Sequence, residues 1–255
     1  MTDGALTPRP GAAPLPRMLL AQTVMETRLL LLNGEQLLLT IVLPTLVLVV
    51  FSTVSVVDVG AGRRVNYVLP GVLAIAIMAT AFTGQAIATG FERRYGVLKR
   101  LAVTPLPRWG FMAAKTGSIV LAELLQLVLL LGVGLALGWT PKGSVVAVAA
   151  LLVLGTAAFS GLGLLMAGTL RAEATLALAN LVFLLFLVGG GVVVPLDKFP
   201  AGVAAGLRLL PAGALSDGLR AVIQRGAAFP GPDALVLLAW SVVAIGAAGA
   251  AFRWE

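Results

Sequence analysis

Apolar segments about as long as a bilayer is thick recur along this chain, and they restrict the folds open to it. A helix of about 20 apolar residues crosses the hydrocarbon core of a membrane. Apolar residues make up 59% of the chain and charged residues 11%, and the mean hydropathy is +1.03. In soluble domains about half of the residues are apolar and about a quarter are charged. In water such a chain would expose more apolar surface than it could bury. We therefore predict an all-α integral membrane protein.

The apolar segments are separated by short polar connections, which predicts one transmembrane domain over residues 17–255. Residues 1–16 are rich in proline, alanine and glycine, and we expect them to form a disordered cytoplasmic tail. Six membrane-spanning helices are predicted, at residues 36–57, 67–89, 111–138, 144–170, 174–194 and 232–252.

Glycines within two of these spans predict tight contacts between helices, because small residues let helix backbones approach each other. In the third span the candidates are Gly132, Gly134 and Gly138. In the fourth span they are Gly155, Gly161, Gly163 and Gly168.

Residues 17–33 predict a further helix ahead of the first span. At 100° per residue, Arg17 and Arg28 lie on one side of this helix, and Gln22 and Glu26 lie on nearly the opposite side. These polar side chains make a full membrane crossing costly. We expect an amphipathic helix in the cytoplasmic interface; the alternative is an extension of the first span into the cytosol.

The distribution of basic residues predicts the orientation in the membrane. With six spans, 11 of the 18 basic residues fall on the side that holds both termini and the connection between spans 2 and 3. Because short cytoplasmic loops carry an excess of Lys and Arg, we expect the N- and C-termini to be cytoplasmic.

Several common kinds of functional site are missing from the sequence. The chain has no cysteine and no histidine, which removes thiolate chemistry and the commonest metal ligand. It also has no G-x-x-x-x-G-K-[S/T] phosphate loop. We expect no catalytic residue, no metal and no bound cofactor. The net charge of +7 suits contact with anionic lipid headgroups and not with nucleic acid.

Polar residues within the predicted spans are functional candidates, because they are costly in lipid. Glu123 is the one acidic residue deep in a span, and Gln126 lies one turn further along the same helix. Glu123 could serve the transport pathway, or it could hold helices together through Gln126 or a neighbouring helix. For Gln85 and Asn180 we favour hydrogen bonds between helices over contacts with a substrate.

The polar interval at residues 91–108, FERRYGVLKRLAVTPLPR, separates the second and third spans. Pro105 and Pro107 should end a short helix here and fix the start of the third span. This helix would have an apolar face suited to a groove on a protein partner, formed by Val97, Leu98, Leu101 and Ala102. A basic loop that only fixes topology is the simpler alternative.

Residues 92–106 resemble the cytoplasmic loop of the type-2 ABC exporter permeases, a family that includes bacterial drug and antibiotic exporters. The shared pattern is acidic, basic, any two residues, glycine, aliphatic, leucine, polar, basic, leucine, any two residues, threonine, proline. The order of an interfacial helix, six spans and a long segment before the last span is similar as well. Family members often carry a second acidic residue where this chain has Arg94, so the charge of the first turn differs.

The resemblance implies a permease that works as a dimer with an identical or homologous chain in the bacterial plasma membrane. It also implies two cytosolic ATPase subunits, which bind ATP and Mg and hold the loop helix in a groove. The residues to which the resemblance gives a role in ATPase coupling are Glu92, Arg93, Gly96, Leu98, Arg100, Leu101 and Pro105.

Residues 195–231 are too polar and too often interrupted by proline to cross the membrane. We predict two short amphipathic helices, at 200–210 and 213–225, the second with a polar face formed by Asp217, Arg220 and Gln224. The resemblance implies a re-entrant extracellular segment that acts as a gate. The candidate gate residues are Pro195, Phe199, Pro200, Pro211 and Arg220.

Together these features predict the transmembrane subunit of an ATP-driven exporter for a hydrophobic or amphipathic small molecule, such as a drug, an antibiotic or a lipid-like compound. Export of polysaccharide or glycolipid is one alternative, although aromatic residues, which sugar pathways favour, make up only 6% of the chain. A stand-alone carrier without an ATPase is the other.

Overall fold

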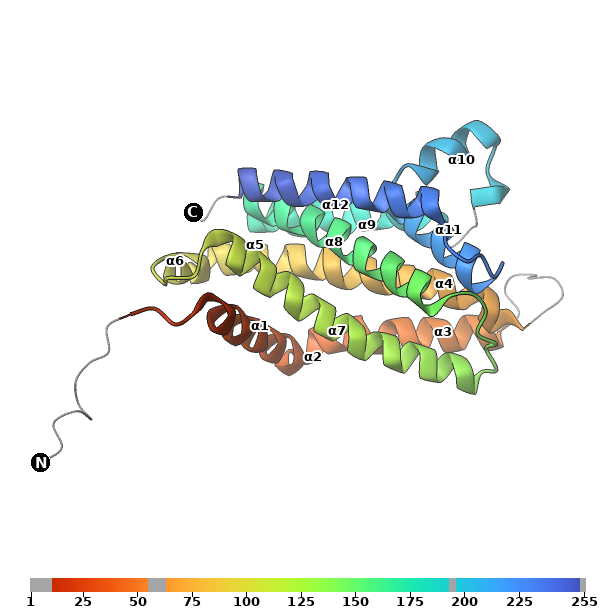
Figure 1. The fold of residues 1–255 in the computed structure, drawn as a ribbon, viewed down its shortest axis with the longest axis horizontal. Helices are drawn as coiled ribbons and strands as arrows, with labels where there is room; N and C mark the ends of the chain where they lie inside the picture. The colour runs from red at the N-terminus through yellow and green to blue at the C-terminus, as the bar shows by residue number, and fades with distance from the viewer. Residues whose placement is uncertain (1–10, 55–62, 193–195, 253–255) are drawn as a thin grey trace, which may run out of the picture.

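The computed structural model describes residues 11–54, 63–192 and 196–252, and every regular element in these ranges is helical (Figure 1). The predicted all-α class is therefore confirmed. Residues 1–10 of the predicted tail lie outside the described residues. The α-helices are α1 (Leu15–Leu32), α2 (Gly34–Leu37), α3 (Leu43–Thr53), α4 (Arg64–Ile77), α5 (Gln85–Arg94), α6 (Val97–Ala102), α7 (Arg108–Ala136), α8 (Val145–Thr169), α9 (Ala172–Gly189), α10 (Ala201–Arg208), α11 (Pro211–Ile223) and α12 (Gly231–Ala251). The π-helices are η1 (Leu38–Val42) and η2 (Met78–Gly84), and η3 (Leu196–Lys198) is a 3₁₀ turn.

Five helical segments are long and apolar enough to cross a membrane, and they match the second to sixth predicted spans. They are Arg64–Arg94, Trp109–Ala136, Val145–Thr169, Ala172–Gly189 and Gly231–Ala251. The first predicted span, 36–57, is helical through α2, η1 and α3, but its apolar part, Thr40–Thr53, is shorter than the other five. Residues 55–57 lie outside the described residues, so a sixth crossing stays a prediction.

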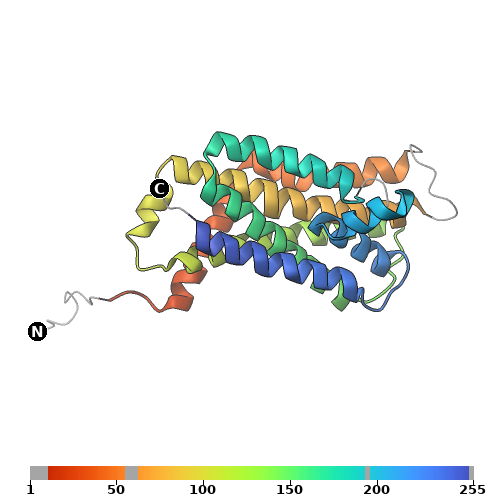
Figure 2. The ribbon, with the colours of Figure 1, turned by 90° about the horizontal axis from the view of Figure 1, so that it is seen from above.

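The long helices lie side by side, and the short helices gather at the two ends of this bundle. Figures 1 and 2 show α6 at the same end as the N-terminal part of α1 and the end of α12, whereas α10 and α11 lie at the opposite end. The segment between spans 2 and 3 therefore shares an end of the bundle with the start of α1 and the end of α12, as the predicted topology requires.

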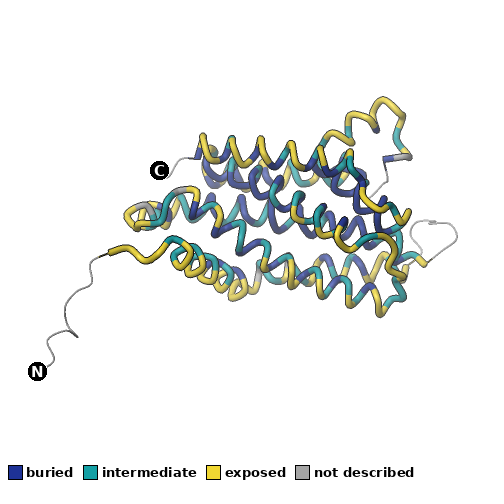
Figure 3. Tube along the Cα trace, viewed as in Figure 1, coloured by how far each residue is buried: buried dark blue, intermediate teal, exposed yellow. Residues whose placement is uncertain are grey.

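The second span, Arg64–Arg94, is the centre of the bundle. In its most apolar part 72% of the residues are buried, against 17% for Ala172–Gly189. Its Phe82 packs against Phe159 of α8 and Phe186 of α9, with ring centroids 6.4 and 6.0 Å away. Figure 3 shows the buried interior, while α10 and the outer faces of α1 and α12 are largely exposed. A movement of the second span must therefore displace the helices around it.

Close helix packing in α8 confirms the prediction for the fourth span. A Cβ atom on Gly161 would lie 2.8 Å from the backbone nitrogen of Ile245 in α12, and one on Gly163 would lie 2.8 Å from the carbonyl oxygen of Phe82. For the third span the prediction is wrong at Gly132, where a Cβ would meet no atom within 4 Å, but a Cβ on Gly134 would lie 3.6 Å from the side chain of Leu69 in α4.

The predicted N-terminal helix is α1, and it packs along α7. A Cβ atom on Gly117 of α7 would lie 3.2 Å from the methyl carbon of Thr23. The absence of a side chain at Gly117 thus brings α1 close to the third span, and its position in the membrane interface stays a prediction.

Candidate functional site

The connection between the second and third spans is a tight turn followed by α6. α5 ends at Arg94, and Gly96 has a left-handed backbone with φ of 74°, which turns the chain directly into α6. A Cβ on Gly96 would meet no atom within 4 Å, so the backbone conformation is what favours glycine here. α6 ends at Ala102, and α7 begins directly after Pro107, as the prolines predict.

Leu98 attaches α6 to the body of the protein. Its side chain is fully buried in a cluster with Phe111 of α7, Leu164 of α8, and Ala248 and Phe252 at the end of the chain. Leu101 is partly buried and packs against the same cluster. The expectation that Leu98 faces a groove on a partner is therefore wrong, because an apolar helix face covers its own core as readily as another protein.

The other side of α6 and its flanking residues are exposed. Tyr95 is 68% exposed, Val97 39% and Val103 87%, and Lys99 and Arg100 are exposed beside them. We call these five residues the outer face of α6. The face combines apolar side chains with two positive charges, which suits a partner with an apolar groove and acidic edges.

Lys115 in α7 joins three segments through a buried charge cluster. Its Nζ donates a hydrogen bond to Glu26 Oε2 in α1 over 2.7 Å and another to Glu92 Oε1 in α5 over 2.8 Å. The same Nζ lies 5.5 Å from the ring centroid of Phe111. Lys115 is only 4% exposed, and removal of a buried ion-pair partner is strongly destabilising. We call Lys115, Glu26 and Glu92 the Lys115 cluster.

The sequence did not reveal the Lys115 cluster. From the sequence, Lys115 is one of the basic residues that set the topology, and Glu26 is one of the polar residues of the N-terminal helix. The one available signal is that charged groups near the membrane need partners, and it does not say which residues pair. In the structure Glu92 forms an internal ion pair, so its side chain is not part of the outer face of α6.

The end of α5 is also tied to the connection between α8 and α9. Arg93 donates a hydrogen bond to the carbonyl oxygen of Leu170, and Arg94 forms an ion pair with Glu173. Arg94, the departure from the family pattern, therefore has an acidic partner in α9. A hollow of about 520 Å³ lies between the two segments, and Arg171 and Lys99 are among the residues that line it.

Gln126 of α7 supplies a hydrogen-bond donor that Pro44 of α3 lacks. Pro44 has no N–H group, so the carbonyl oxygen of Thr40, four residues earlier, loses its α-helical donor. The Gln126 Nε2 atom of α7 donates a hydrogen bond to this oxygen. Gln126 is buried, and it therefore joins α7 to the η1–α3 segment instead of pairing with Glu123.

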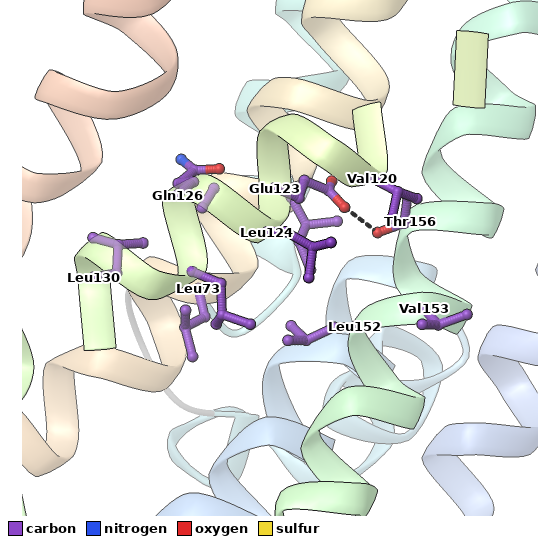
Figure 4. Close-up of a pocket in the computed structure, with 12 residues that line it drawn as sticks. Leu73, Val120, Glu123, Leu124, Gln126, Leu130, Leu152, Val153 and Thr156 are labelled. Atoms are coloured by element: carbon purple, nitrogen blue, oxygen red, sulfur yellow. Dashed lines mark hydrogen bonds between the residues drawn. The ribbon is translucent and has the colours of Figure 1, made fainter. Parts of the chain in front are cut away.

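Glu123 has one partner in a neighbouring helix. Thr156 of α8 donates a hydrogen bond from its Oγ1 to Glu123 Oε2, as Figure 4 shows. Glu123 Oε1 is buried and has no hydrogen-bond partner among the described residues. Both residues line a cavity of about 70 Å³ between α4, α7 and α8. Of the two alternatives for Glu123, the hydrogen bond to a neighbouring helix is present, and it uses only one of the two carboxylate oxygens.

Gln85 and Asn180 do not form the predicted hydrogen bonds between helices. Asn180 is exposed and donates to the carbonyl oxygen of Leu176 in its own helix over 2.8 Å. Gln85 is 3% exposed, and neither of its side-chain amide atoms has a partner among the described residues. It lines a polar cavity of about 140 Å³ that also contacts the Lys115 cluster and Gln36.

The segment before the last span forms η3, α10 and α11. Pro195 lies outside the described residues. Phe199 and Pro200 lie between η3 and α10, and Pro211 begins α11 as its first residue. Because α11 packs against α4, α8 and α12, nearly all of its residues are buried. The predicted helices at 200–210 and 213–225 are confirmed to within two residues at each boundary.

Arg220 differs most from its predicted environment. It was expected on a polar face, but it is 3% exposed and donates hydrogen bonds to the carbonyl oxygens of Gly191 and Val192, the latter over 2.7 Å. These carbonyl groups follow the end of α9. Arg220 therefore fixes α11 to the end of the fifth span.

Comparison with known proteins gives the family. No curated protein matches this chain. A family model described as "ABC-2 family transporter protein" matches residues 61–250, a range that includes the α5–α6 turn, the Glu123 cavity and α11. On this match the chain belongs to the ABC-2 transporter family, as a multi-pass membrane component of an ABC exporter.

Proposed function

We propose that this chain forms the translocation pathway for a hydrophobic or amphipathic small molecule, driven by separate ATPase subunits that bind at the outer face of α6. The observation that carries the proposal is that α6 is firmly attached to the bundle through Leu98 and, on its other side, presents Val97 next to two basic residues. The ATPases bind ATP and Mg, because this chain has no phosphate loop of its own.

Movement of α6 passes to the bundle through two groups of contacts. The Leu98 contacts join α6 to α7, α8 and the end of α12. The Lys115 cluster joins α5, α7 and α1. Because packed interiors transmit displacement, closure of two ATPases on ATP would move these helices as one body and change access to the pathway.

The composition supports an apolar or amphipathic cargo. Apolar residues make up 59% of the chain, and it has two tyrosines and four tryptophans, which are few for stacking against sugar rings. We propose that a second permease chain, identical or homologous, completes the pathway. In this proposal the termini and α6 face the cytoplasm, and α10 and α11 act as an extracellular gate.

ATP hydrolysis by the assembled complex tests the proposal. The chain is co-expressed with a phosphate-loop ATPase subunit and reconstituted in lipid. Val97→Asp should strongly reduce substrate-stimulated hydrolysis while membrane insertion and thermal stability are retained, because Val97 is 39% exposed. Val145→Asp is the matched control, since Val145 is an exposed valine at the start of α8, outside both the outer face of α6 and the proposed gate. Equal activity of both variants contradicts the proposed docking site.

A further inference from the structure

We infer that the cavity beside Glu123 binds the protonated amine of an amphipathic molecule. The inference deepens the proposed function, on which it rests for the view that such a molecule is cargo. Binding itself needs no ATPase and is argued from the cavity alone.

The carboxylate of Glu123 has one oxygen that is not paired among the described residues. Its Oε2 accepts the hydrogen bond from Thr156, whereas its Oε1 is buried and has no hydrogen-bond partner among the described residues. Among these residues no Lys or Arg forms an ion pair with Glu123. Figure 4 shows the carboxylate between α7 and α8, among the aliphatic side chains of the cavity.

The remainder of the cavity is almost wholly apolar. Glu123, Gln126 and Thr156 are its polar residues, and the other nine lining residues are aliphatic. The side-chain amide of Gln126 is already bound to Thr40. Leu124 and Val153 line the cavity and are 52% and 63% exposed, so the cavity opens between α7 and α8 on the outside of the chain.

This combination selects the chemistry of the ligand. A carboxylate oxygen taken out of water is costly unless it is paired. An ammonium group supplies both an opposite charge and an N–H donor, and so stabilises the ionised carboxylate, whereas a neutral apolar molecule leaves Oε1 unpaired. The volume of about 70 Å³ holds roughly five water-sized groups. It therefore suits an amine with its first carbons, and the rest of the ligand would extend past Leu124 and Val153.

Two probes that differ only at the amine, which is charged in one and acetylated and neutral in the other, test the inference. The first is a dansyl-labelled long-chain primary amine, and the second is the same molecule with its amine acetylated. The purified chain is placed in nanodiscs of phosphatidylcholine, without any ATPase, and binding is followed by dansyl fluorescence. We expect the amine to bind about tenfold to a hundredfold more tightly than its acetylated form, as a charge-assisted hydrogen bond predicts.

Variants locate the site. Glu123→Gln keeps an acceptor for Thr156 but removes the charge, so the preference for the amine should disappear. Asn180→Leu is the control in another span and should keep the full preference, because Asn180 bonds only within its own helix. Val153→Trp keeps the carboxylate and fills the opening at an exposed position, so it should weaken amine binding and reduce the preference for the amine. It tests the site independently of the folding of Glu123→Gln.

Equal binding of the two probes by the unmodified chain overturns the inference, and so does an unchanged preference in Val153→Trp or in folded Glu123→Gln. Glu123 is then only a polar contact between α7 and α8. The two proposals fail separately. Loss of probe selectivity leaves the α6 docking experiment unaffected, and failure of the Val97→Asp experiment leaves amine binding intact.

Discussion

Lys115 and Glu26 are 89 residues apart in the sequence, yet Lys115 Nζ donates a 2.7 Å hydrogen bond to Glu26 Oε2 in the protein interior. This contact ties α1 to the third span. Because Lys115 also binds Glu92, one turn before the start of α6, the N-terminal helix is linked to the proposed ATPase-binding segment through one side chain.

Loss of the lysine should therefore destabilise the whole cytoplasmic end. Lys115→Met leaves two carboxylates without their cation, and we expect a cost of about 3–5 kcal/mol in the free energy of unfolding. Thermal unfolding in detergent measures it, with Lys99→Met as the exposed control. Adding Glu26→Gln and Glu92→Gln to Lys115→Met should restore most of the lost stability, because no carboxylate is then left unpaired. Equal stability of Lys115→Met and Lys99→Met contradicts a buried cluster.

Leu98 and Val97 are adjacent in sequence but should respond differently to truncation. Leu98→Ala leaves a cavity in a fully buried cluster, which costs about 2–5 kcal/mol, whereas Val97→Ala should cost less than about 1 kcal/mol because the side chain is partly exposed. Unfolding midpoints compare the two. If both variants are equally stable, Leu98 does not hold α6 to the bundle.

The pairing of Gln126 with Pro44 can be tested by a double-mutant cycle. Gln126→Leu leaves the Thr40 carbonyl oxygen unsatisfied and should cost about 1–3 kcal/mol. Pro44→Ala restores a backbone N–H, so Gln126→Leu should cost less in that background, with a coupling energy of about 1 kcal/mol. Additive effects on unfolding would mean that Gln126 does not replace the missing donor.

Gly161 should not tolerate even one added methyl group. Gly161→Ala places a Cβ atom 2.8 Å from the backbone of α12, and separating the helices should cost about 1–3 kcal/mol. Gly246→Ala is the matched control in α12, because a Cβ there meets no atom within 4 Å. Thermal unfolding compares the stability of the two variants. If Gly161→Ala is as stable as Gly246→Ala, α8 and α12 do not pack closely at Gly161.

Much of this fold could be predicted from the sequence because the controlling features are local. Apolar length locates the spans, and prolines such as Pro107 and Pro211 lie within four residues of the predicted helix starts, at the boundaries where α7 and α11 begin. The glycines of the fourth span indicate close packing correctly, whereas Gly132 of the third span has no neighbour that a side chain would meet within 4 Å. A small residue permits close contact, and only the arrangement of the neighbours decides whether contact occurs.

The site was harder to predict because its residues are defined by their partners. The apolar face that contains Leu98 is equally compatible with a groove on another protein and with the chain's own core. Arg220 has the helical spacing of a surface residue, although its partners are carbonyl groups near the end of α9. Glu123 could be recognised as unusual from its depth in a span, but Thr156 as its partner depends on how α8 packs against α7.

The position of the ATPase can be measured directly, because the chain contains no cysteine. A single Val97→Cys substitution carries a photo-activated cross-linker, and Val203→Cys serves as the control at the far end. In a complex that hydrolyses ATP, we predict a cross-link from position 97 to the ATPase and none from position 203. An active complex without a cross-link from position 97, or with equal cross-linking from both positions, contradicts docking at the outer face of α6.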